Sequence, residues 1–143
     1  GEQMYRVAHD YYYHAVYNQV PPGEVGRYHL QTAKCLSAHE NEYIEPLLAH
    51  HYRKAKDERN TMRCLYRAAK SHFRRDHIPQ ACGFLIDAVR IGDHLLMESE
   101  DFCEMKLMLA EMLLYLGRHT DAVVYLHQVE DMLGFACCPE END

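Results

Sequence analysis

Two segments of the chain, residues 62–95 and 103–136, carry the same pattern of small and large apolar residues. In each, apolar positions recur at the spacing of an α-helix, and a short break separates two such runs. The packing positions are Leu65, Ala68, Ala81, Leu85 and Ala88 in the first segment, and Leu109, Ala110, Leu113, Leu116, Gly117, Ala122 and Leu126 in the second. A helical hairpin of about 34 residues cannot bury its apolar face alone, so it has to stack on its neighbours. The chain is therefore predicted to be all-α, a right-handed stack of antiparallel helix pairs.

The same periodicity predicts about seven helices and no strand. Their expected ranges are 4–20, 24–38, 43–56, 60–75, 78–91, 95–116 and 119–132. Residues 1–136 then form a single helical repeat domain, in which 4–56 are degenerate helices and 62–95 and 103–136 are the repeats, and residues 137–143 form a solvated tail.

Breaks and caps set the expected helix ends. We expect Pro21-Pro22-Gly23 to end the first helix, Asn60 to cap the fourth, Gly92-Asp93 to end the fifth and Gly134 to end the seventh. The two repeats are out of step with a standard period, because Ala81 and Ala122 lie 41 residues apart. An extended sixth helix, or a looser connection over 92–100, is expected to absorb the excess of about two helical turns.

Composition indicates a folded chain of 143 residues, 48% of which are hydrophobic. No run of 18 apolar residues and no signal peptide is found, and the chain is interpreted as a fragment of something longer or as carrying a tag remnant. Cysteines are expected one to a helix, as small buried hydrophobes, at Cys35, Cys64, Cys82 and Cys103. Without a CxxC pair, and with Cys137 and Cys138 adjacent, this usage favours a reduced, cytoplasmic location.

Charge is distributed unevenly along the chain. Residues 53–75 carry nine bases against two acids, a net +7, while residues 76–143 have a net −11 and residues 1–52 a net −3. Within the basic band, Arg63, Arg67, Lys70 and Arg74 are spaced by four, three and four residues, so they share one face of the fourth helix. We predict that they form a partner-binding surface, which captures an acidic segment or a C-terminal carboxylate by charge-assisted hydrogen bonds. The alternatives are a solvated helix face that the chain's own acids partly neutralise, and a surface for nucleic acid or anionic lipid.

Residues 62–136 resemble degenerate tetratricopeptide repeats, although the Trp and most of the Gly of that pattern are missing. The resemblance implies a tetratricopeptide-like stack, in which the first helix of each pair lines a concave surface that binds other proteins. On this basis the basic face of the fourth helix would border a groove shared with the sixth helix.

A second resemblance covers about the first two thirds of the chain. The residues that carry it are Tyr5-Arg6-Val7-Ala8-His9-Asp10, Ala15-Val16-Tyr17, Arg27-Tyr28-His29, Ala33, Leu48-Ala49-His50-His51-Tyr52, Ala55, Tyr66, Ala68 and Ala69. This order is similar to the helical region that follows the nucleotide-binding module in large signal-transduction NTPases with tetratricopeptide tails, a family that includes soluble adenylyl cyclase. The likeness implies an arm downstream of an ATPase module, with His29 and His50-His51 as packing and hydrogen-bonding positions between helices. It carries over no active site, because the chain has no GxxxxGK[ST] phosphate loop.

Two functions therefore stay open. The first is a protein-interaction or scaffolding module of a larger intracellular signalling protein, and the second is an integral regulatory arm of a nucleotide cyclase or NTPase with no independent partner. A separable module is expected to be monomeric, whereas an integral arm is expected to expose a large apolar patch and self-associate. A helical enzyme fragment is a weaker third alternative.

No enzyme activity, cofactor or nucleic-acid partner is expected for this segment. The eleven histidines raise the question of a metal site, but His9 and His14 are five residues apart and His50 and His51 are adjacent, which is poor spacing for ligands on one helix. Net charge of −7 also disfavours nucleic acid.

Overall fold

The computed structural model describes residues 14, 17–39 and 44–134. These residues form six helices: α2 (Pro22–Leu36), α3 (Ile44–Lys54), α4 (Glu58–Arg74), α5 (Ile78–His94), α6 (Glu100–Tyr115) and α7 (His119–Leu133). The described ranges contain no strand, so the predicted all-α class is confirmed for them. Of the first helix predicted at 4–20, only residues 14 and 17–20 are described. Residues 14 and 17–19 are helical and Val20 is not, and the predicted tail at 137–143 lies outside the described residues.

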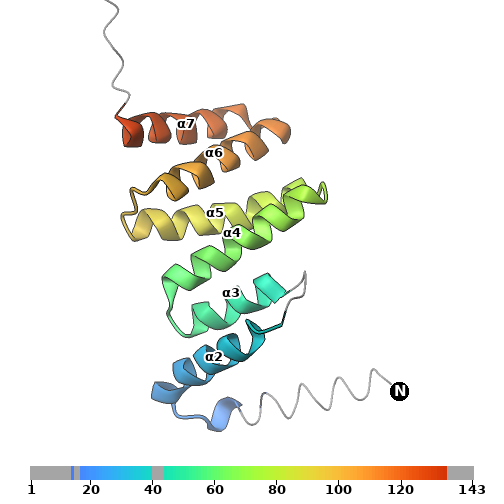
Figure 1. Ribbon diagram of the computed structural model, residues 1–143, viewed down its shortest axis with the longest axis vertical. Helices are drawn as coiled ribbons and strands as arrows, with labels where there is room; N and C mark the ends of the chain where they lie inside the picture. Colours follow the sequence, from blue (N-terminus) through green and yellow to red (C-terminus); the bar gives the residue numbers. More distant parts are fainter. Residues whose placement is uncertain (1–13, 15–16, 40–43, 135–143) are drawn as a thin grey trace, which may run out of the picture.

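The helices follow one another along the long axis in chain order, and successive helices run in opposite directions (Figure 1). Each packs chiefly on the helix before it and the helix after it, and α4 and α5 share the most extensive interface. One buried apolar cluster extends from Ala33 in α2 to Ala122 in α7. The α4–α5 interface is close because Ala68, Ala69 and Ala81 place no bulk between the two backbones.

Most of the predicted packing positions are confirmed as core. Nine of them are at most 4% exposed: Leu65, Ala68, Ala81, Leu85, Ala88, Leu109, Ala110, Leu113 and Ala122. The other three are Leu116, Gly117 and Leu126. Leu116 lies at the C-cap of α6 and is 38% exposed, Gly117 in the following turn is also exposed, and Leu126 is partly buried.

In the N-terminal part, two large side chains lie outside the core: Tyr28 of α2 and Leu47 of α3 are nearly half exposed. The buried side of α3 includes Leu48 and His51, and Leu47 points about 100° away from Leu48 around the helix. Cys35 was expected among apolar neighbours, but it is exposed.

Four helices, α3 to α6, end with the same backbone turn. The second residue after the last residue of each helix has a positive φ, at Lys56, Asp76, Leu96 and Gly117. The next N–H then donates to a carbonyl five residues earlier, as from Asp57 to Tyr52 at 2.9 Å. This Schellman geometry turns the chain back on itself within a few residues. Because the four positions are 20, 20 and 21 residues apart, two successive helices take 40 or 41 residues, which accounts for the spacing of Ala81 and Ala122.

The predicted end of the fifth helix at Gly92-Asp93 is wrong, and so is the predicted start of the sixth at residue 95. Helix α5 continues to His94, and α6 begins at Glu100 after a connection over 95–99. Gly92 is buried inside α5, where a Cβ atom would lie 2.1 Å from the ring of Phe102. The glycine is therefore needed for the close approach of α6 to α5 and does not break the helix.

Two predicted helix starts also need correction. Helix α2 begins at Pro22, because the fixed φ of proline suits the first turn of a helix. The N-cap of α4 is Asp57, whose carboxylate accepts a hydrogen bond from the Asn60 N–H at 3.2 Å, so Asn60 is the capped residue and not the cap. The predicted end of α7 at Gly134 is confirmed by its left-handed φ of 69°.

Candidate partner-binding groove

A hollow of about 280 Å³ lies between α4 and the start of α6, and we call it the α4–α6 groove. Its α4 side is formed by Met62, Arg63, Tyr66, Arg67 and Lys70. Its other side is formed by Met97, Ser99, Asp101, Phe102 and Met105. Three of the four bases predicted from the sequence therefore line one hollow, together with residues that are more than 25 positions away in the chain.

The four predicted bases differ in their surroundings. Lys70 places its Nζ 4.4 Å from the centre of the Tyr66 ring, and Arg67 lies 4.0 Å from the Glu45 carboxylate of α3. Among residues 14, 17–39 and 44–134, no acid forms an ion pair with Arg63. Arg74 does not line the groove, and its Nε donates to the Lys70 carbonyl at 3.4 Å. The chain's own acids thus partly neutralise Arg67, while Arg63 and Lys70 keep their charge available to a partner.

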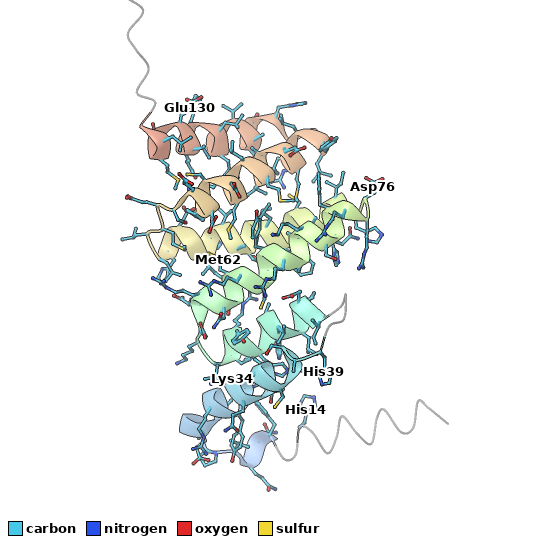
Figure 2. The ribbon with its side chains drawn as sticks, in the orientation of Figure 1. His14, Lys34, His39, Met62, Asp76 and Glu130 are labelled. Atoms are coloured by element: carbon cyan, nitrogen blue, oxygen red, sulfur yellow. The ribbon has the colours of Figure 1, made fainter. Side chains whose placement is uncertain are left out.

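The floor of the groove is apolar and rich in methionine. Met62, Phe102 and Met105 are at most 4% exposed, and Met97 is half-buried. Met62 lies near the start of α4, on the side where α5 leads into α6 (Figure 2). Methionine has an unbranched, polarizable side chain that adapts to the shape of what it contacts. Apolar side chains of different shapes therefore pack well on this floor.

The N-terminus of α6 sets the far wall of the groove. The Ser99 hydroxyl accepts a hydrogen bond from the Phe102 N–H at 3.3 Å and so caps the helix. Phe102 packs below against Gly92 of α5 and is 1% exposed. Sequence analysis missed this wall because it placed 95–100 inside a helix. The signal that could have found it is Ser99 followed by two acids, the pattern of a helix start.

A buried lysine ties the helices beneath the groove, and sequence analysis also missed it. Lys106 on α6 is 4% exposed, and its Nζ lies 2.8 Å from Asp93 of α5 and donates to Gln128 of α7 at 2.9 Å. The same Nζ lies 4.8 Å from the centre of the Phe102 ring. A lysine is almost never fully buried unless paired, so this one joins three successive helices.

A histidine cluster joins α2 to α3. The Nδ1 atoms of His29 and His51 are 2.9 Å apart, and His29 Nε2 lies 3.1 Å from the Tyr17 hydroxyl. The prediction that these positions pack and hydrogen-bond between helices is confirmed for His29 and His51, whereas His50 is exposed. Burial lowers the pKa of His29, and the charges of His50 and Lys54 lower it further. Burial lowers the pKa of His51 as well, with added effects of His29 and His50.

A second hollow, of about 300 Å³, lies at the α3–α4 turn beside the end of α5. Arg53, Lys56, Glu58, Thr61 and Ile91 line it. Two of its charges are already paired within the chain, because Arg53 lies 3.9 Å from Asp87 and Glu58 lies 3.8 Å from His94. It therefore offers a partner less free charge than the α4–α6 groove.

Within residues 14, 17–39 and 44–134, no group of three or more His, Cys, Asp or Glu side chains is placed to hold a metal ion. His14, His29, His50 and His51 belong to this part of the chain, and His9 lies outside it. None of the described helices has the length and apolar character that crossing a membrane requires.

Comparisons of the chain with protein-family models, with curated proteins and with solved structures gave no match.

Proposed function

We propose that this chain is a protein-interaction module, a tetratricopeptide-like helical stack that holds an acidic segment of a partner protein in the α4–α6 groove. The observation that carries the proposal is the meeting of Arg63, Arg67 and Lys70 with an apolar floor in one hollow. Bases on the rim attract carboxylates and set orientation, and the floor gains affinity by burying an apolar side chain. The partner is either another protein or another domain of the same signalling protein.

The stacking of the helices supports this proposal, while their period differs from the usual tetratricopeptide design. Each helix packs chiefly on its chain neighbours, as in repeat proteins, so α4 and α6 are left to border a surface. The two-helix period of 40 or 41 residues is longer than the usual tetratricopeptide period of about 34. The proposed stack is therefore an elongated variant of that design.

A labelled peptide tests the proposal. The probe is a fluorescein-labelled peptide with one leucine flanked by glutamates, titrated with the protein at physiological salt and followed by fluorescence anisotropy. We expect Arg63→Glu and Lys70→Glu each to weaken binding at least tenfold. Arg74→Glu is the matched control, since it makes the same charge change on the same helix outside the groove, and it is expected to change affinity less than threefold. If Arg63→Glu and Arg74→Glu weaken binding equally, the loss of affinity reflects net charge alone and the groove is not the binding site.

An integral regulatory arm of a nucleotide cyclase or NTPase is the second candidate, and exposed apolar side chains favour it. Tyr115 is 66% exposed, and Leu107, Leu114, Val123 and Val124 of α6 and α7 are each 44–51% exposed. An apolar surface of this kind is typical of a face that another domain covers. Analytical ultracentrifugation separates the two candidates. A monomer over a hundredfold range of concentration supports the separable module, and concentration-dependent self-association supports the arm.

A further inference from the structure

The two walls of the α4–α6 groove carry opposite charges. The α4 wall presents Arg63, Arg67 and Lys70, and the α6 wall presents Asp101. Glu104 follows Asp101 by three residues, so both lie on the same side of α6. Burial raises the pKa of the Tyr66 phenol, and the negative charges of Glu104 and Asp101 raise it further. Both carboxylates therefore act on a side chain that lines the groove from the opposite helix.

The opposite charges do not cancel each other across the groove. Among the described residues, no ion pair within 4.0 Å joins a base of α4 to an acid of α6. The C-terminal ends of α4 and α6 also lie near each other, since the ring centres of Phe73 and Tyr115 are 6.3 Å apart. A basic row and an acidic row thus face each other across a gap, and each is available to a third segment.

The secondary structure of the bound segment follows from the three surfaces of the groove, which are the basic wall of α4, the acidic wall of α6 and the apolar floor. A β-strand has only two faces, because successive side chains alternate, so it cannot direct one kind of residue to the floor and two others to opposite walls. A helix has 3.6 residues per turn and can present three faces at once. Arg63, Arg67 and Lys70 span seven residues, roughly 10 Å along the axis of α4, which matches two turns of a helix lying alongside.

The size of the hollow limits the apolar face of the segment to one anchor. Its volume of about 280 Å³ is below the range of roughly 300–1,000 Å³ for pockets that enclose drug-sized molecules. Single large side chains that fill a hollow of this kind supply much of the binding free energy of an interface.

Resting on the function proposed above, we propose that the segment bound in the α4–α6 groove is a charge-segregated helix. One flank carries carboxylates that pair with Arg63, Arg67 and Lys70, the opposite flank carries lysine or arginine that pairs with Asp101 and Glu104, and one large apolar side chain enters the methionine-lined floor. A uniformly acidic segment brings its second flank against the carboxylates of α6, where like charges repel.

Three synthetic helical peptides of equal length test this inference, each with the same leucine anchor and the same helix-favouring backbone. The segregated peptide has glutamates on one flank and lysines on the other. The mixed peptide has the same composition with glutamate and lysine alternating on both flanks, and the acidic peptide has glutamate on both. Isothermal titration calorimetry with the full chain at physiological salt is expected to give at least tenfold tighter binding for the segregated peptide than for the other two.

Charge variants of the α6 wall give the second measurement. The double variant Asp101→Lys/Glu104→Lys is expected to weaken binding of the segregated peptide at least fivefold and to strengthen binding of the acidic peptide. The control, Glu130→Lys/Asp131→Lys, makes the same change in net charge on α7, where Glu130 points away from α6 (Figure 2), and is expected to alter neither affinity more than twofold.

The outcomes separate this inference from the function on which it rests. If the acidic peptide binds as tightly as the segregated one, the inference is wrong and the acidic-segment function stands. If the mixed peptide binds as tightly as the segregated one, the arrangement of charges on the two flanks does not affect binding, and the inference is also wrong. If none of the three binds, the proposed function fails together with it.

Discussion

The contribution of the buried lysine to stability can be worked out from its contacts. The ammonium of Lys106 lies 2.8 Å from an Asp93 oxygen, and its side chain is 5% exposed while that of Asp93 is 50% exposed. At this distance the attraction is roughly 6 kcal/mol for an effective dielectric constant of about 20. Removing Asp93 leaves a buried charge, but Gln128 and the Phe102 ring still contact it. We therefore expect Asp93→Ala to lower the free energy of unfolding by about 2–4 kcal/mol.

The converse substitution is expected to be much milder. Lys106→Met keeps a similar volume and removes the buried charge. It leaves without their lysine partner only Asp93, which water already reaches, and the amide oxygen of Gln128, which is half-buried. Its free energy of unfolding should stay within about 1 kcal/mol of the parent, because replacing a buried charge by an apolar side chain avoids its desolvation. Urea unfolding followed by circular dichroism measures both, and in the double variant the Asp93→Ala loss should largely disappear. A greater loss from Lys106→Met than from Asp93→Ala would refute this account of the lysine.

Three further predictions concern the helix contacts and ends. Gly92→Ala forces a Cβ into an aromatic ring of α6 and should destabilise the protein by about 1–3 kcal/mol. In the control Gly83→Ala the new Cβ meets nothing within 4 Å, so this variant should be neutral or stabilise the protein by up to about 1 kcal/mol. The urea midpoints of unfolding of the two variants measure the difference. Leu96→Gly should raise stability by about 1 kcal/mol, since Leu96 is 85% exposed and has a φ of 53° that glycine adopts freely; a lower thermal midpoint would contradict this. The pKa values of His29 and His51 are lowered in the folded state, so the unfolded chain binds more protons and stability should fall as the pH drops below about 6.5. The free energy of unfolding should therefore differ less between pH 7.5 and pH 5.5 for His29→Gln than for the parent.

Helical periodicity was enough to predict most of the core from the sequence. Leu65, Ala68 and Leu85 were placed correctly, because one face of each helix has to be buried whatever the neighbouring helix is. Helix ends were predicted less well, because they depend on contacts with other helices. Gly92 looks like a terminator in isolation, but the ring of Phe102, ten residues later, requires a glycine within the helix.

The candidate groove was half predictable for the same reason. The spacing of Arg63, Arg67 and Lys70 along one helix is visible in the sequence, and it was sufficient to place three bases on one surface. Their relation to Asp101 was not visible, since it depends on where α5 ends and how closely α6 approaches it. Arg74 continues the spacing but lies outside the hollow, which shows that a helical stripe does not by itself define the length of a site.

Phe102 connects the floor of the groove to the buried lysine, because its side chain contacts both. One edge of its ring fills the space over Gly92, its side chain lines the groove, and the Lys106 ammonium lies over the ring. Lys106 in turn is held by Asp93 of α5 and Gln128 of α7. A substitution at Asp93 is therefore expected to alter the binding surface, although Asp93 does not line the groove. Because binding needs an ordered floor, Asp93→Ala should weaken the segregated peptide more than Lys106→Met does, in the same order as their effects on stability.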